Sequence, residues 1–207
     1  MDYQEYRGIR GLVIAEVEED TTGGYTAGEW QELSGVQSVS ITKNESSESH
    51  FYDNAARIVI DAEGADELAL VVSVLANKTR ALIDGVGYDQ THDMIINTPK
   101  QRKYFALGYI GEKTDGSEEF NIFYKGKFSG GAETHNTKDD GTEATNVEYT
   151  FTAVHTTAKI AETSTKTVKS IKVPASTKVT EAKVFGVFTS GVSTLSPLTP
   201  DDIKALA

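Results

Sequence analysis

The sequence predicts a mainly β protein: an antiparallel β-sandwich or partly closed barrel with one short flanking α-helix and a C-terminal extension. Three observations lead to this prediction. Large and small residues alternate over residues 103–154, the same stretch contains the tight-turn dipeptide Asp115-Gly116, and the 207-residue chain is 38% hydrophobic but has no cysteine. A chain of this size without disulfides depends on burial and on hydrogen-bonded strand ladders.

The stretch 103–154 predicts three consecutive antiparallel strands. Phe105, Leu107 and Tyr109 share one face of the first run, as the two-residue period of a strand requires. Asp115-Gly116 then supplies the positive φ values of a tight hairpin. The spacing recurs in the return run and in a third run after a polar gap, at Phe120, Ile122 and Tyr124 and at Tyr149, Phe151 and Ala153.

The first part of the chain predicts further strands and the helix. Strands are expected at Gly11–Glu18 and Gly35–Thr42, where β-branched residues are frequent,. Arg57–Asp61 and Glu67–Leu75 are interpreted as a strand pair joined by a turn at residues 62–66, with the second strand covered on both faces. Asn77–Asp84 is the helix, with Asn77 as its N-cap and Gly85 at its end.

Two segments are expected to be irregular. Residues 43–54 are polar and acidic, so in an isolated molecule they should be flexible,. Residues 88–102 are interpreted as an irregular connection.

The last part of the chain looks appended. The predicted organisation is a β domain at 1–155 and a C-terminal arm or small appended segment at 156–207, although two separate domains are an alternative. Strands are expected at Ile171–Val173 and Ala182–Phe188. A final helix at Pro200–Ala207 should be capped by Thr199 with Asp202,.

Charge is distributed unevenly along the chain. Residues 1–75 contain 15 Asp and Glu against 4 Lys and Arg, whereas residues 76–207 contain 16 of each sign, so the first third carries the whole net charge of −11. Such a surface repels phosphate and disfavours stable nucleic-acid binding. The N-terminus lacks the pattern of an export signal and no stretch has about 20 apolar residues. We therefore expect a cytoplasmic protein with no membrane partner.

Motifs for catalysis and metal binding are not found. The four histidines (His50, His92, His135 and His155) are far apart and lack ligand spacing,. The loop at residues 136–147 has Lys138 and Val147 where a calcium loop needs ligands. No phosphate loop or nucleophile elbow is present. The sequence thus predicts neither an enzyme nor a cofactor.

The motif FYDNAA (Phe51–Ala56) resembles the major tail protein family of long-tailed bacteriophages, which often carries a similar aromatic element after a polar stretch. The order of the following segments is also similar: ELALVVSVL, a short helix, FALGYIGEKTDGSEEFNIFYKGKFS, a polar loop and NVEYTFTAV. The likeness spans roughly Gly35–Val154 and leaves residues 156–207 outside it.

The resemblance implies a tail-tube subunit that forms hexameric rings stacked into a hollow conduit. A stacking loop at residues 43–57 would reach the next ring, and channel-lining acids would repel passing DNA over about 8 Å, so that it passes without stable binding. The residues implied for stacking are Lys43, Asn44, Glu45, Phe51, Tyr52, Asp53, Asn54 and Arg57. Those implied for the channel are Asp61, Glu63, Asp66 and Glu67.

The implied partners are other copies of the chain and other tail proteins, namely the tape measure, the tail terminator and the baseplate. The implied location is the virion tail, with host cytoplasm during assembly. A tube of a related injection system is a close variant. A different class is a β-sandwich module for carbohydrate binding or host-surface adhesion, in which Tyr6, Tyr25, Trp30 and Tyr88 would stack on sugars.

Overall fold

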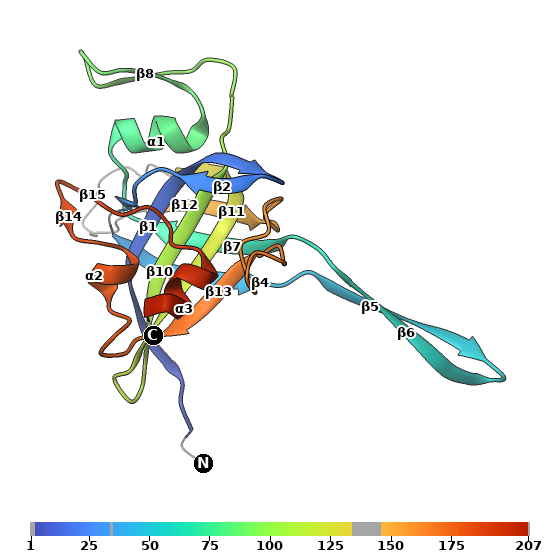
Figure 1. Cartoon of the computed structure of the whole chain (residues 1–207). Coiled ribbons are helices and arrows are strands. Elements are labelled where there is room, and N and C mark those ends of the chain that lie inside the picture. The colour runs from blue at the N-terminus through green and yellow to red at the C-terminus, as the bar shows by residue number, and fades with distance from the viewer. Residues whose placement is uncertain (1–2, 34, 134–145, 207) are drawn as a thin grey trace, which may run out of the picture.

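The computed structural model describes residues 3–33, 35–133 and 146–206. These form a mainly β fold in which a large antiparallel sheet curls into a half-barrel (Figure 1). The predicted fold class is therefore confirmed. Within the described residues the sheet has eleven strands: β1 (Tyr6–Thr21), β2 (Gly24–Ala27), β3 (Gln31–Glu32), β4 (Val36–Thr42), β7 (Asp66–Val72), β10 (Phe105–Lys113), β11 (Glu118–Ala132), β12 (Val147–Ala153), β13 (Ser170–Pro174), β14 (Phe188–Thr189) and β15 (Val192–Ser193).

The order of strands across the sheet is β14-β15-β3-β1-β10-β11-β12-β7-β4, with β2 paired to β1 and β13 paired to β11. The predicted succession β10, β11, β12 is confirmed, and its registers include Leu107↔Phe123 and Phe128↔Phe151. The sheet has β4 at one end and the two-residue strand β14 at the other.

Both faces of the central strands are buried, so the sheet is the middle layer of the molecule. Alternate residues of β10 enter different core clusters: Leu107 and Tyr109 belong to the first, whereas Ala106 and Ile110 belong to the second. This alternation is the two-residue period that the sequence shows. Tyr124 of β11 is fully buried in the second cluster.

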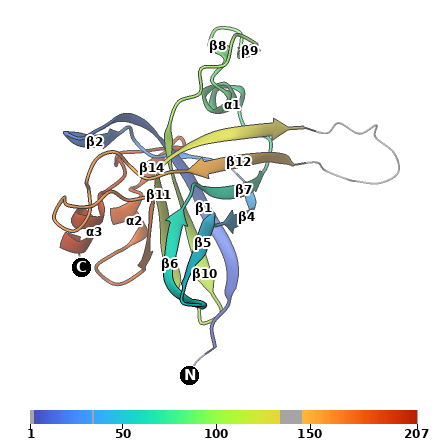
Figure 2. The same cartoon turned by 90° about the vertical axis from the view of Figure 1, so that its right-hand side faces the viewer.

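The helix at residues 77–84 is confirmed as α1 (Asn77–Asp84), which ends at Gly85 with φ of 67°. Its predicted cap is wrong, because Ala76 occupies the N-cap and the Asn77 side chain donates to Asp93 O at 2.9 Å. The following connection contains a small hairpin of β8 (Gly87–Asp89) and β9 (Met94–Ile96) rather than irregular chain. Figure 2 shows α1 and this hairpin together at one end of the molecule.

The C-terminal segment is part of the body, which corrects the prediction of an appended arm. Strand β13, at a predicted position, extends the sheet beside β11. Val184, Phe185 and Ile203 complete the second core cluster. The expected strand at residues 182–188 is wrong, because α2 (Glu181–Val184) occupies its first half.

The final helix is α3 (Pro200–Leu206), and its predicted capping box is present. Thr199 N donates to Asp202 Oδ2 at 3.0 Å, while Asp202 N donates to Thr199 Oγ1 at 3.2 Å. The described residues therefore contain three short helices, of which α1 and α3 were expected and α2 was not. None of them is long and apolar enough to cross a membrane.

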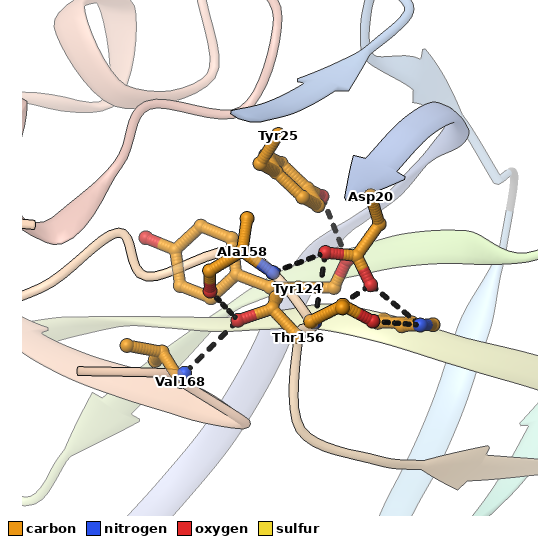
Figure 3. A network of polar contacts seen from close by, with 8 residues as sticks. Asp20, Tyr25, Tyr124, Thr156, Ala158 and Val168 are labelled. Carbon is orange, nitrogen blue, oxygen red and sulfur yellow. Dashed lines mark hydrogen bonds and ion pairs between the residues drawn. The ribbon is translucent and has the colours of Figure 1, made fainter. Parts of the chain in front are cut away.

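A buried polar network fastens the C-terminal segment to the sheet (Figure 3). The Asp20 carboxylate accepts hydrogen bonds of 2.8 Å from the backbone N–H groups of Thr157 and Ala158, and it pairs with Lys125. Burial by itself raises the pKa of Asp20, but these hydrogen bonds outweigh burial and lower it below its ordinary value,. Asp20 is therefore a charged anchor between β1 and the chain that follows β12.

Candidate functional site

The main surface feature is a β-hairpin that projects away from the body (Figure 1). It consists of β5 (Glu45–Tyr52) and β6 (Ala55–Glu63), and we call it the projecting hairpin. The prediction that residues 43–54 are flexible is corrected here, because Glu45–Tyr52 is regular antiparallel strand. The stacking role implied for residues 43–57 stays a prediction. The predicted pairing of 57–61 with 67–75 is also wrong, since β6 pairs with β5 and β7 pairs with β4 and β12.

Almost every residue of the projecting hairpin is exposed, including its apolar ones. Ile58, Val59 and Ile60 are 49%, 57% and 53% exposed. Because neighbouring strand residues point to opposite faces, exposure of three in a row means that the described residues cover neither face of the hairpin. Exposed edge strands rich in β-branched residues readily pair with other chains.

The tip of the projecting hairpin is a tight turn between two aromatic residues and two alanines. Asp53 and Asn54 have φ of 51° and 61°, the left-handed values of the turn that favours Asn and Asp between twisted strands. Phe51 and Tyr52 are 69% and 55% exposed. The FYDNAA motif thus builds the end of the hairpin and presents two aromatic rings there.

The projecting hairpin is a continuation of the β4–β7 pair of the main sheet. Register pairs Thr42 with Glu67 in the sheet and Glu45 with Glu63 in the hairpin. The ladder is interrupted between them at residues 43–44 and 64–65, a segment that we call the joint. There Gly64 N donates to Asn44 O at 2.7 Å, and the Asn44 side chain donates to Ala65 O at 2.8 Å.

Lys169 contacts the joint from the C-terminal segment. Its side chain is 5% exposed, and its Nζ donates to Glu63, to Gly64 O at 2.9 Å and to Asp66 Oδ1 at 3.1 Å. His155 Nε2 lies 3.4 Å from the same Glu63 carboxylate. Burial by itself lowers the pKa of Lys169, but the carboxylates of Glu63 and Asp66 raise it above its ordinary value,. Lys169 is therefore a charged group at the joint.

A second surface lies on the side of β4, β7 and β12 that faces away from the first core cluster. The prediction that β7 is covered on both faces is wrong for the single chain, because its Glu67 and Ala69 are exposed. We call this surface the polar face. Hydroxyl and acidic side chains predominate among its residues, which the strand registers align as Ser38, Ser40, Thr42, Glu67, Ala69, Val71, Glu148, Thr150 and Thr152.

The predicted site residues fall into three places. Phe51, Tyr52, Asp53 and Asn54 form the tip, as described, and Arg57 lies on β6. Lys43 and Asn44 lie at the joint, where Lys43 Nζ is 3.9 Å from Glu45 Oε1.

The four predicted channel acids do not share one surface. Asp61 is exposed on the projecting hairpin and Glu67 belongs to the polar face. Glu63 lies at the joint, where Lys169 lowers its pKa. Asp66 is only 5% exposed and is paired with Lys169. Asp66 is therefore corrected from a surface acid to a buried one.

Sequence reasoning missed several residues of this region. Lys169, His155 and Gly64 were not selected, and Ile58–Ile60 were assigned to a strand paired with Glu67–Leu75. The available signal was the run of three β-branched residues beside an acidic polar segment. Such a run favours a strand, and a strand needs a partner strand, which the neighbouring polar segment could supply. Nothing in the sequence around Lys169 distinguishes it from other lysines.

The remaining surface offers little that is specific to a reaction. A cleft of about 940 Å³ lies beside α1 and the turn at residues 190–192, and the Lys103–Glu16 ion pair of 2.6 Å is in its lining. Among the described residues no group of three or more His, Cys, Asp or Glu is placed to hold a metal ion. His135 and most of the calcium-like loop at 136–147 lie outside the described residues.

The aromatic residues considered for sugar stacking do not form a platform. Trp30 is fully buried in the second core cluster. Tyr25 donates from its hydroxyl to Tyr124 O at 2.6 Å and stacks edge-on against that ring. Tyr6 is exposed, but Tyr88 lies on the separate β8–β9 hairpin. Trp30 and Tyr25 are therefore part of the fold, and Tyr6 and Tyr88 lie on different elements.

Taken together, the fold and surface define a half-barrel body with a projecting hairpin that exposes a short apolar run, and with a separate polar face. Comparison with models of known protein families gives no match. Comparison with curated protein sequences also gives no significant match.

Proposed function

We propose that this protein is the structural subunit of a phage tail tube, assembling as hexameric rings that stack into a hollow conduit. The observation that carries the proposal is the projecting hairpin, whose apolar residues Ile58, Val59 and Ile60 are exposed on both faces. In a single chain such a hairpin gains almost nothing from burial. Contact with copies of the same chain would cover it and would remove a strand edge open to uncontrolled pairing.

The polar face supports the conduit part of the proposal. Its exposed side chains are mostly short hydroxyls, with the carboxylates of Glu67 and Glu148 among them. We assign this face to the channel, where the carboxylates repel DNA phosphates and the hydroxyls contribute no positive charge that would attract them. DNA would pass such a wall without stable binding. Other tail proteins would then meet the two ends of the tube in the virion.

Ring closure would use the ends of the curled sheet. Strand β4 is the last strand in the sheet order, so its outer edge has no partner within the described residues. Joining this edge to a neighbouring subunit would continue the polar face from one subunit to the next. The β-strand pairing that builds the body would thus also build the ring.

The test is electron microscopy of the purified protein at high concentration, beside a variant with residues 45–63 replaced by a short Gly-Ser turn. We expect rings or tubes of constant diameter from the natural chain and none from the variant. The variant should remain folded, because Asn44 O and Gly64 N already lie 2.7 Å apart and a short turn can connect them.

Two controls make the result decisive. Thermal unfolding should show that the variant keeps the cooperative transition of the natural chain. Its loss of β-strand signal should be no larger than the contribution of the removed strands. Natural protein that stays monomeric at high concentration, even with tail-initiator proteins added, would contradict the proposal.

A further inference from the structure

The direction of the projecting hairpin depends on a joint that has few backbone constraints. The strand ladder stops at Thr42↔Glu67 and resumes at Glu45↔Glu63. Across the joint, the backbone contributes the bond from Gly64 N to Asn44 O, and the Asn44 side chain adds the bond to Ala65 O. Beyond the joint, the two-stranded ribbon packs on none of the other described residues. Such an interrupted ribbon bends easily about the joint.

Lys169 adds the contacts that this joint otherwise lacks. Its ammonium group binds both sides of the connection between β6 and β7: Glu63 at the end of β6, the Gly64 carbonyl, and Asp66 at the start of β7. Its own backbone is held in the body, because Tyr124 N donates to Lys169 O at 3.0 Å. One side chain thus links the last residue of the hairpin to the central strand β11.

We propose that Lys169 is a positioning residue that fixes the direction in which the projecting hairpin leaves the body. The C-terminal segment, which lies outside the region of family resemblance, thereby sets the geometry of the hairpin. This inference concerns the single chain and does not require assembly. Its consequence, that Lys169 controls how regularly subunits stack, rests on the proposed function.

The charged groups around Lys169 explain why it can act in this way. Asp66 is nearly as buried as Lys169, so removal of the Lys169 charge leaves the buried Asp66 carboxylate without its cation,. Glu63 is more exposed and is also approached by His155. Asp66 therefore holds the ammonium group in place, and the ammonium group holds the end of β6 through Glu63 and Gly64 O.

The experiment measures the hairpin direction in the monomer. Because the chain has no cysteine, Ser49→Cys on the hairpin and Thr177→Cys on the body, both exposed, can carry two spin labels. Pulsed dipolar spectroscopy should give a single narrow distance distribution in the natural background. Lys169→Met, which keeps the buried alkyl stem, should cause loss of that narrow distribution.

Two further variants keep the test decisive. Lys166→Met removes an exposed lysine paired with Glu162 in the same segment and should leave the distribution unchanged. If Lys169→Met alone folds poorly, Asp66→Asn with Lys169→Met removes both buried charges and should restore folding while the distribution stays broad. A distribution in either Lys169 variant that superimposes on the natural one would overturn the inference.

Electron microscopy of the same proteins tests the consequence for assembly. Tubes of variable diameter or curvature from Lys169→Met, beside regular tubes from Lys166→Met, are expected. If the natural chain forms no tubes, the proposed function fails while the spin-label result still decides the role of Lys169. Regular tubes from a Lys169 variant with a displaced hairpin would contradict only the consequence.

Discussion

The two long hairpins of this protein have the same local structure and opposite surroundings. In β10–β11, every residue from Phe105 to Gly111 is buried, and side chains from the two faces enter two different core clusters. In β5–β6, nearly every residue is exposed, although Ile58, Val59 and Ile60 are as apolar as core residues. Strand pairing alone therefore does not explain both hairpins. The first is stabilised by burial within the chain, whereas the apolar run of the second is left uncovered by the described residues.

The largest expected difference comes from truncating one phenylalanine in the buried core and one at the exposed hairpin tip. Phe151 is fully buried and its ring lies 4.9 Å from that of Phe128, whereas Phe51 is 69% exposed at the hairpin tip. We expect Phe151→Ala to lower the free energy of unfolding by about 3–5 kcal/mol because it leaves a cavity. Phe51→Ala should change it by less than about 0.5 kcal/mol.

Chemical denaturation of the monomer at low protein concentration measures both values. A loss for Phe51→Ala that approaches that of Phe151→Ala would show that the projecting hairpin packs on the body in solution. The comparison between the two hairpins would then be wrong.

A smaller effect is expected at Asp20, which ties β1 to the C-terminal segment. At neutral pH, Asp20→Asn should lower the free energy of unfolding by about 2 kcal/mol, because a buried charged acceptor loses its charge-assisted hydrogen bonds. The folded-state pKa of Asp20 lies below its unfolded value. The stabilisation is therefore fully present well above an unfolded pKa of about 3.9 and is lost as pH falls through the folded value.

The measurement is the difference in unfolding free energy between the natural chain and Asp20→Asn, taken from pH 7 down to pH 2. This difference should shrink as the pH falls. Asp53→Asn at the exposed hairpin tip is the matched control and should stay within about 0.5 kcal/mol of the natural chain. A difference for Asp20→Asn that grows on acidification would contradict the assigned role of the carboxylate.

The sequence predicted those elements whose signal is local. Asp115-Gly116 predicted its turn, the alternation around Leu107 predicted the buried strands, and Thr199 with Asp202 predicted the start of the last helix. Each signal comes from residues that lie within a few positions of one another. The capping of α1 was predicted wrongly, because the Asn77 side chain donates to the Asp93 carbonyl in the turn of the next hairpin instead of capping its own helix.

The projecting hairpin was missed because the alternation of apolar and polar residues indicates a strand only where one face of that strand is buried. Strand β5 is polar on both faces, so its sequence is typical of a loop, and Ile58–Ile60 were paired with the nearest apolar run instead. The Lys169 contact joins residues more than a hundred positions apart. Its effect depends on how β13 approaches the joint, which sequence spacing does not encode.

The same comparison explains why the C-terminal segment looked appended. Its composition is small and polar, but several of its large residues, such as Val179, Phe185 and Ile203, are buried in the second core cluster. In the projecting hairpin the opposite holds, since a short apolar run remains exposed. Mean composition therefore does not show which of these two segments packs into the body.

The smallest expected effect on monomer stability is the one that bears most directly on assembly. Ile58→Thr with Ile60→Thr changes two exposed residues that share one face of β6,. Threonine keeps strand propensity, so the free energy of unfolding of the monomer should change by less than about 0.5 kcal/mol. If both isoleucines are buried between copies, however, the contact loses about 2 kcal/mol of apolar burial. The protein concentration at which tubes first form should then rise more than tenfold, as sedimentation and electron microscopy would measure.

Val187→Thr, at a valine of the body that is 66% exposed, should leave that concentration unchanged. Equal effects of the two variants would show that general surface hydrophobicity, and not the projecting hairpin, drives association.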